Sequence, residues 1–404
     1  MISLSITKKF VLVAALLFFW FSLFQGSALI EQFQDAADSV VIDALLLKGK
    51  GEYTFGGFLV RGDYYRATNT ERESPIPSAY LSRYGFQFRI FDVLWPRTLA
   101  LETYAAALRF LMALLLAATL SLFIFVMRKE FGLLPALGVC IGILSSPWLV
   151  LYSGSITWAI FASFLPFVFV WAFYRHLRPK FLLLCLAIGG LIFFKALFGY
   201  EYLPNIVLST LVPLLYYELR DKSSWFAIAK KSAAVFISGV VGFLAVLGLH
   251  IYQGAVYLGS VSAIIAHLAG KRVERATVDL SGMPHIVLDY LVGPAYLKTS
   301  VFTQVFFSLV YLWTMGIFFF GVIFLAFFWL KYHKNIRAYP SSQLNSLFFA
   351  TILSYLATLS WAVLMPEGMA MHPQMAAMIF YLPANLMVAI FFFFAVTKLW
   401  HERT

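Results

Sequence analysis

Long apolar runs that alternate with short charged gaps are the feature that most limits what this chain can fold into. Ten runs in the 404-residue sequence approach or exceed the length of about 20 residues with which a helix crosses a bilayer. Six of the gaps hold 16 Lys and Arg against 4 Asp and Glu, and the five that alternate with them are close to neutral. Cytoplasmic loops of membrane proteins carry such a basic excess. The sequence therefore predicts an all-α, polytopic transmembrane helix bundle with both termini in the cytoplasm.

Helices are required because lipid offers no hydrogen-bond partner to an open backbone. The predicted spans are Phe10–Leu29, Tyr104–Met127, Leu133–Trp148, Trp158–Tyr174, Phe181–Leu197, Leu203–Tyr217, Ser232–Tyr252, Val301–Leu330, Leu347–Leu364 and Met375–Val396. The first span ends in small residues, so a cleaved signal peptide is the alternative there. Its apolar stretch is long for a signal peptide, and cleavage would leave the remaining topology unchanged.

Composition supports a membrane protein and excludes two functional classes. Hydrophobic residues make up 62% and charged residues 12% of the chain, whereas soluble domains are about 45–50% apolar and about 25% charged. The six basic gaps carry a net charge of +12 and the rest of the chain −1, so the sequence shows no single basic groove for nucleic acid. Those gaps are too short for a nucleotide-binding domain, and the sequence has no GxxxxGK[ST] loop. Both cysteines lie inside apolar runs and indicate neither a disulfide nor a metal site.

We expect residues 1–404 to form one integral membrane domain. Two of the gaps that face outward are long. Residues 30–103 form a first extracytoplasmic loop of 74 residues, and residues 253–300 a second of 48. Loops of this length have structure or a function of their own, and polar side chains concentrate there. We detect no internal repeat, which weighs against an inverted-repeat transporter.

Three carboxylates follow the first span: Asp35, Asp38 and Asp43. On a helix, Asp35 and Asp38 share a face and Asp43 lies about 80° from Asp35. Carboxylates at the membrane surface can act as a general base or hold a divalent metal ion. A solvated helix face is the alternative.

Further polar and aromatic groups along the chain suit a sugar or a phosphate. Tyr80, Arg83, Tyr84 and Gln87 precede the second span and combine hydroxyl, guanidinium and amide groups, although an interfacial aromatic belt explains them equally well. Lys195 and Arg109 are cations inside predicted spans, and Tyr200 and Glu201 follow Lys195. Such cations either bind a ligand phosphate or extend to the interface. Trp158 and His372 flank outward gaps, where a histidine is more often a surface residue. If the spans form one bundle, these groups surround one outward-facing pocket.

Several short motifs carry a resemblance: SRYGFQ before the second span, SPW after the third, KALFGYEY between the fifth and sixth, and a Trp and His before the last. Their placement is similar to that in a group of uncharacterised bacterial multi-pass proteins, which resembles the GT-C superfamily of membrane glycosyltransferases. Many GT-C enzymes have two adjacent acids in the first loop, more spans and a C-terminal periplasmic domain, and this chain differs in all three respects.

The resemblance implies a base among Asp35, Asp38 and Asp43, and Lys195, Arg83 or Arg109 facing the phosphate of a polyprenyl-phosphate sugar donor. The predicted function is sugar transfer to a cell-envelope glycan or lipid acceptor at the outer face of the bacterial inner membrane, among membrane lipids. The alternatives are a lipid or polysaccharide transporter (flippase), a surface-polymer polymerase and a non-catalytic assembly partner.

Overall fold

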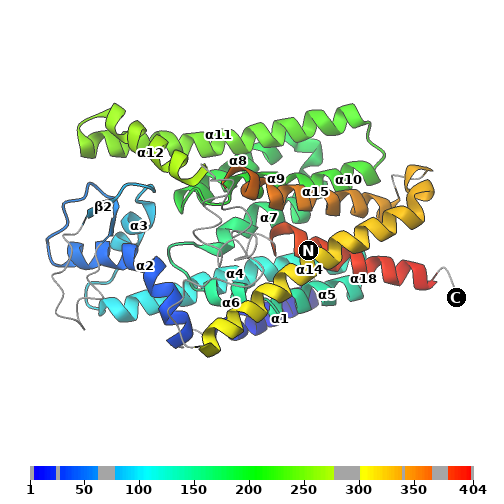
Figure 1. Cartoon of the computed structure of the whole chain (residues 1–404), viewed down its shortest axis with the longest axis horizontal. Coiled ribbons are helices and arrows are strands. Elements are labelled where there is room, and N and C mark those ends of the chain that lie inside the picture. The colour runs from blue at the N-terminus through cyan, green and yellow to red at the C-terminus, as the bar shows by residue number, and fades with distance from the viewer. Residues whose placement is uncertain are drawn as a thin grey trace.

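The computed structural model describes residues 4–23, 28–61, 78–276, 301–338, 342–365 and 381–401, and most of them are helical (Figure 1). In chain order the elements are α1 (Leu4–Ser22), α2 (Ala28–Gly49), β1 (Leu59–Arg61), β2 (Ser78–Tyr80), α3 (Phe86–Leu94), α4 (Leu101–Phe131), α5 (Leu133–Leu144), α6 (Pro147–Tyr152), α7 (Ile160–Leu177), η2 (Arg178–Lys180), α8 (Phe181–Leu197), α9 (Leu203–Ser209), α10 (Leu211–Arg220), α11 (Trp225–Leu258), α12 (Val261–Ala276), α14 (Val301–Ala338), α15 (Gln343–Leu364), η4 (Tyr381–Asn385) and α18 (Leu386–His401). The predicted all-α class is confirmed for these residues, apart from one short hairpin.

The long helices run side by side, and the two ends of the bundle differ. α2, β2, α3 and α12 gather at one end, at the left of Figure 1, which we call the hairpin end. The C-terminus and the turn from α10 to α11 lie at the opposite end, which we call the basic end because Arg175, Arg178 and Arg220 lie there. Helix α11 extends along one edge of the molecule between the two ends.

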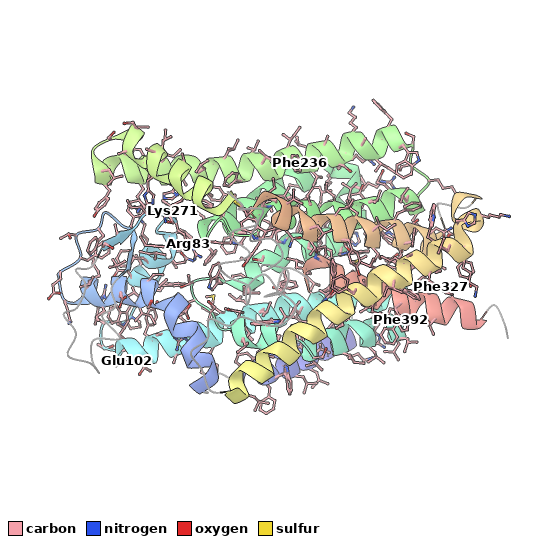
Figure 2. The ribbon with its side chains drawn as sticks, in the orientation of Figure 1. Arg83, Glu102, Phe236, Lys271, Phe327 and Phe392 are labelled. Carbon is pink, nitrogen blue, oxygen red and sulfur yellow. The ribbon has the colours of Figure 1, made fainter. Side chains whose placement is uncertain are left out.

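Five helical stretches of the described chain are long and apolar enough to cross a membrane: Leu101–Phe131, Ile160–Leu197, Trp225–Leu258, Gly316–Lys334 and Gln343–Trp361. The stretch Ile160–Leu197 contains both α7 and α8, which pack against each other across η2. Large apolar side chains cover the outside of the bundle; Phe236 is 41% exposed and Phe327 is 56% exposed (Figure 2). Water disfavours such a surface, so the fold is consistent with a transmembrane protein.

Some predicted spans differ from the observed helices. The predicted span Leu203–Tyr217 is divided into α9 and α10, which meet at Thr210, and α10 continues to Arg220. The predicted span Leu133–Trp148 ends early, at Leu144, because Ser146 caps a new helix and Pro147 occupies its first turn. Proline lacks the amide that an interior helical position donates, so it favours such a start. Residues 375–380 of the last predicted span lie outside the described residues.

The first predicted loop has structure of its own. Helix α2 is followed by an antiparallel pair in which Leu59 faces Tyr80, and then by α3. Gly85 closes this unit: a Cβ atom added there would overlap the carbonyl oxygen of Gly57. The close contact joins the segment after α2 to the start of α3, and Arg83 and Gln87 lie two residues to either side of Gly85.

Helices α8 and α11 also approach closely through glycine. A Cβ atom added to Gly242 of α11 would overlap the carbonyl oxygen of Gly189 in α8, and Gly189 itself faces the carbonyl of Ser238. Small residues at helix interfaces allow this backbone contact inside membranes. The backbone contact therefore fixes the distance between α8 and α11.

We expect Gly242→Ala to destabilise the protein, because the new methyl group forces α8 and α11 apart. Overpacking of this kind costs about 1–3 kcal/mol. Gly248→Ala is the matched control, since a Cβ atom there meets no atom within 4 Å. Thermal unfolding in detergent measures both. Equal stability of the two variants would show that the helices can separate without cost.

Candidate functional site

One residue, Thr157, connects the polar groups at the hairpin end through its backbone amide and carbonyl. It lies in the turn between α6 and α7. Its amide donates to Oδ1 of Asp38 over 3.0 Å, and its carbonyl accepts from Nε2 of Gln87 over 2.8 Å and from the Arg83 guanidinium over 3.4 Å. Three segments far apart in the sequence are thereby joined at one point.

Asp38 is the central carboxylate of this group. Its side chain is fully buried, Oδ1 also accepts from the hydroxyl of Ser155 over 3.0 Å, and Oδ2 pairs with Nε of Arg109 at 3.4 Å. Burial raises the pKa of the Asp38 carboxyl above its usual range, and Arg109 and the backbone donors oppose that shift. Arg109 remains 18% exposed, so it forms the more open side of the ion pair. The alternative of a solvated helix face is wrong for Asp38.

Arg83 and Glu201 form a second ion pair beside the first. Nη2 of Arg83 lies 2.8 Å from Oε1 of Glu201, and both side chains are nearly inaccessible. The guanidinium also lies over the ring of Trp158, 4.3 Å from its centroid, and 6.0 Å from that of Tyr80. This stacking fixes the plane of the guanidinium and leaves its charge balanced by Glu201.

Lys195 completes the group at the end of α8. It is 2% exposed, and its Nζ donates to the carbonyl of Gly199 over 2.9 Å. Simple extension to the interface is therefore wrong for this lysine. Gly199 has a φ of 137°, and a Cβ atom there would overlap the carboxylate of Glu201. Only glycine fits between the lysine and the glutamate.

Two α11 side chains that sequence reasoning missed hold the site together. Nδ1 of His250 lies 2.8 Å from the hydroxyl of Tyr200, and its Nε2 lies 3.1 Å from the carbonyl of Leu81. Gln253 accepts from the amide of Gly85 and donates to the carbonyl of Gly56. Their spacing of three residues places both on one face of a helix, which is the signal that could have identified them.

Other predicted residues lie apart from this cluster or outside the described part. Asp43 is fully buried, but it lies about 140° around α2 from Asp38. Asp35 is in α2, although its side chain is outside the described residues, as is His372 altogether. Tyr84 packs under Arg89, with the guanidinium 5.5 Å from the ring centroid. The structure thus joins Asp38 and Arg109 with Arg83, Glu201, Gln87 and Trp158.

The predicted metal site remains a prediction. Within the described ranges, no three His, Cys, Asp or Glu side chains lie close enough to hold an ion together. The positive groups there are protein side chains: Arg83, Arg109 and Lys195.

Comparisons with known proteins identify no relative of this chain. The sequence matches no protein-family profile, no curated protein and no solved structure. The chemistry of the site must therefore be argued from its own geometry. A carboxylate shielded from water, beside cations whose side chains are held by hydrogen bonds, suits proton removal next to an anionic leaving group.

Proposed function

We propose that the protein is a GT-C-like membrane glycosyltransferase. It moves a sugar from a polyprenyl-phosphate donor to a cell-envelope glycan or lipid acceptor at the extracytoplasmic face of the bacterial inner membrane. The observation that carries the proposal is the junction at Thr157, where two buried carboxylates, Asp38 and Glu201, lie with three cations at one end of an apolar bundle. The basic end would then be cytoplasmic, in keeping with the charge bias of the gaps.

Each group has a role that its surroundings support. Asp38 accepts the proton of the acceptor hydroxyl, and Arg109 orients its carboxylate. Lys195 and Arg83 face the phosphate that departs. Because Glu201 balances Arg83, Lys195 supplies the excess positive charge that stabilises the phosphate. Trp158, Tyr80 and Gln87 supply stacking and hydrogen bonds for the sugar. Because the donor is already a phosphosugar, the reaction requires no nucleotide on this side.

A transporter is the second candidate, because one seam of the bundle contains more polar groups than the sequence suggested. Buried polar side chains line the contact of α9 and α10 with α15: Asn205, Ser209, Thr210, Thr351, Ser354 and Thr358. Four of the hydroxyls, however, donate to carbonyls three or four residues earlier in their own helices. Such bonds satisfy the hydroxyls within their own helices. The seam therefore gives little support for a polar substrate path, and the transferase remains the favoured candidate.

The test of the proposal is Lys195→Met, assayed in purified protein with a synthetic polyprenyl-phosphate sugar. The substitution removes a buried charge, so we expect unchanged or higher thermal stability. Donor binding should weaken, and Lys195→Arg should restore it only in part because the guanidinium has a different geometry.

Lys48→Met is the matched control, since Lys48 is an exposed lysine at the end of α2. It should leave donor binding unchanged. Unaltered donor affinity in a well-folded Lys195→Met protein would remove the phosphate role. Absence of any sugar transfer by the wild-type protein, with binding of the donor intact, would instead favour the transporter or a non-catalytic partner.

A further inference from the structure

One side chain of the candidate site, Gln87 of α3, bonds to two other segments at once. Its Nε2 donates to the carbonyl of Thr157 over 2.8 Å and to the carbonyl of Phe198 over 2.9 Å. Both N–H groups of the amide are thereby used. Turning the amide over would place Oε1 against the two carbonyl oxygens, so the hydrogen bonds fix its orientation. Gln87 therefore links the α6–α7 turn to the end of α8.

The two carbonyls belong to different halves of the site. On one side, the amide of Thr157 donates to Oδ1 of Asp38 over 3.0 Å. On the other side, Phe198 follows the last turn of α8, where its amide donates to the carbonyl of Lys195 over 3.0 Å. The carbonyl of the next residue, Gly199, accepts from Nζ of Lys195 over 2.9 Å. One amide nitrogen thus joins the segment that holds the carboxylate to the segment that holds the lysine.

Apolar packing alone defines the spacing of these segments less closely. The ring of Phe198 contacts the rings of Phe86 and Phe161, with centroids 5.8 and 6.2 Å apart. Hydrophobic contact is non-directional, whereas hydrogen bonds of this length specify both a distance and a direction. Arg83 also reaches the Thr157 carbonyl, but over the longer distance of 3.4 Å. Gln87 is therefore the tighter link.

The other atom of the amide shows that packing does not explain Gln87. Its Oε1 is buried and has no hydrogen-bond partner among the described residues. A buried acceptor without a donor lowers stability, and an apolar side chain of the same length would avoid that cost. The two carbonyls that the amide joins therefore explain it better than the space that it fills.

We propose that Gln87 is a positioning residue, which fixes the distance between the carboxylate of Asp38 and the ammonium of Lys195. The inference rests on the proposed sugar transfer. In that reaction Asp38 takes the proton of the acceptor hydroxyl, and the hydroxyl oxygen bonds to the anomeric carbon of the sugar. The bond from this carbon to the phosphate oxygen breaks, and polyprenyl phosphate leaves beside Lys195.

Acceptor and donor are each bound by one half of the site. A change in the spacing of the halves therefore leaves both substrates bound but misaligned. A misplacement of about 1 Å between reacting groups costs about 10²-fold in rate. Loss of the link should consequently lower kcat while KM stays close to its wild-type value.

The test measures kcat and KM for a synthetic polyprenyl-phosphate sugar in purified wild-type protein and in Gln87→Met, at a temperature at which both are folded. Methionine keeps the length of the side chain and removes both donated hydrogen bonds. We expect kcat to fall by about 10- to 100-fold with little change in KM for the donor. Gln87→Asn, which keeps the amide on a side chain one methylene shorter, is the milder second variant and should lower kcat in the same direction.

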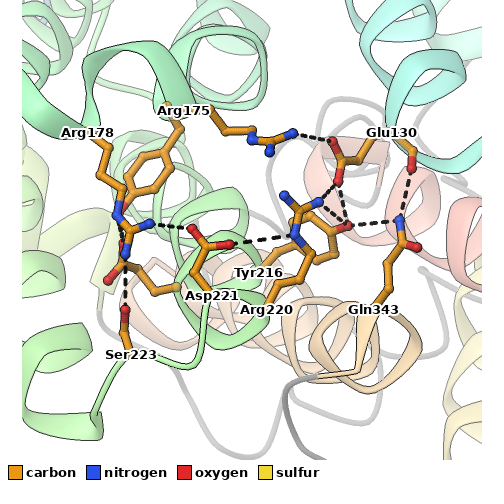
Figure 3. A network of polar contacts seen from close by, with 10 residues as sticks. Glu130, Arg175, Arg178, Tyr216, Arg220, Asp221, Ser223 and Gln343 are labelled. Atoms are coloured by element: carbon orange, nitrogen blue, oxygen red, sulfur yellow. Dashed lines mark hydrogen bonds and ion pairs between the residues drawn. The ribbon is translucent and has the colours of Figure 1, made fainter.

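The basic end has a polar network of its own, which joins α4, α7, α10, α11 and α15 (Figure 3). Glu218 is fully buried there and contacts Nε of Arg178 at 2.9 Å and Nζ of Lys231 at 2.7 Å. Asp221 pairs with Arg178 and Arg220. This network lies at the opposite end of the bundle from the candidate site, so it can supply a control of the same chemistry.

Gln343→Met is that control. As Figure 3 shows, Nε2 of Gln343 also donates to two oxygens, the carbonyl of Glu130 over 2.9 Å and the hydroxyl of Tyr216 over 3.3 Å. The variant loses the same two kinds of contact as Gln87→Met but should keep the wild-type kcat. An equal loss of kcat in the two variants would indicate general loosening of the bundle and would overturn the positioning role.

The remaining outcomes separate this inference from the function on which it rests. A rise in KM for the donor with kcat unchanged would assign Gln87 to sugar binding alone, and wild-type kinetics in Gln87→Met would assign it no part in transfer. Either result overturns the positioning role and leaves the transferase intact. Absence of sugar transfer by the wild-type protein would overturn both.

Discussion

Replacing Asp38 by Asn is expected to lower sugar transfer by about 10²–10⁴-fold, the usual cost of losing a general base. The side chain keeps its shape, and its oxygen can still accept from Ser155 and the amide of Thr157. The variant loses only the charge that takes up the acceptor proton and pairs with Arg109. Because Arg109, 18% exposed, then lacks its charged partner, the free energy of unfolding should also fall by about 3 kcal/mol, and activity is compared at a temperature at which both proteins are folded.

Asp43→Asn is the control, because Asp43 is also fully buried in α2 but lies about 140° around the helix from Asp38. The wild-type pH profile gives an independent check. Since burial raises the pKa of Asp38, the ionised base is lost as pH falls through a value above the usual aspartate pKa of about 3.9. Activity should thus decline at milder acidity than for an exposed aspartate. Wild-type transfer by Asp38→Asn would refute its role.

The sequence was sufficient to predict the helical class and the segments that carry the polar groups. Apolar length and charge bias depend only on local composition, so the helices α4, α7, α8 and α15 lie close to their predicted spans. The same reasoning placed Asp38, Arg83 and Lys195 as candidates. Each stands out because a charged group beside or inside an apolar run is costly.

The contacts between those groups were not predictable. Thr157 connects them through its backbone amide and carbonyl, which every residue type possesses, so no side-chain pattern marks it. The pairing of Arg83 with Glu201 joins positions 118 residues apart and depends on how α3 packs beside the α8–α9 turn. His250 was hidden because a hydropathy window averages a single polar residue into an apolar run. Gln253 was assigned to the second long loop, whereas α11 continues to Leu258.

Glu218→Gln is expected to lower the free energy of unfolding by about 3 kcal/mol. Removing one partner of a buried ion pair costs about 3–5 kcal/mol because the other charge remains unpaired. We take the lower limit because the side chains of Arg178 and Lys231 are 33% and 25% exposed. Water can therefore solvate part of the charge that the substitution leaves unpaired. The glutamine can still accept from Tyr174, so the loss is mainly one of charge.

Asp221→Asn is the matched comparison within the same network. Asp221 pairs with the same Arg178, but its side chain is 33% exposed. Exposed pairs contribute at most about 1 kcal/mol, so this variant should unfold close to the wild type. Raised salt should weaken the Asp221 contribution more than that of Glu218, because buried pairs are screened less. Equal losses in the free energy of unfolding for the two variants would show that burial does not determine how much each ion pair contributes. They would also show that Glu218 does not hold α7, α10 and α11 together.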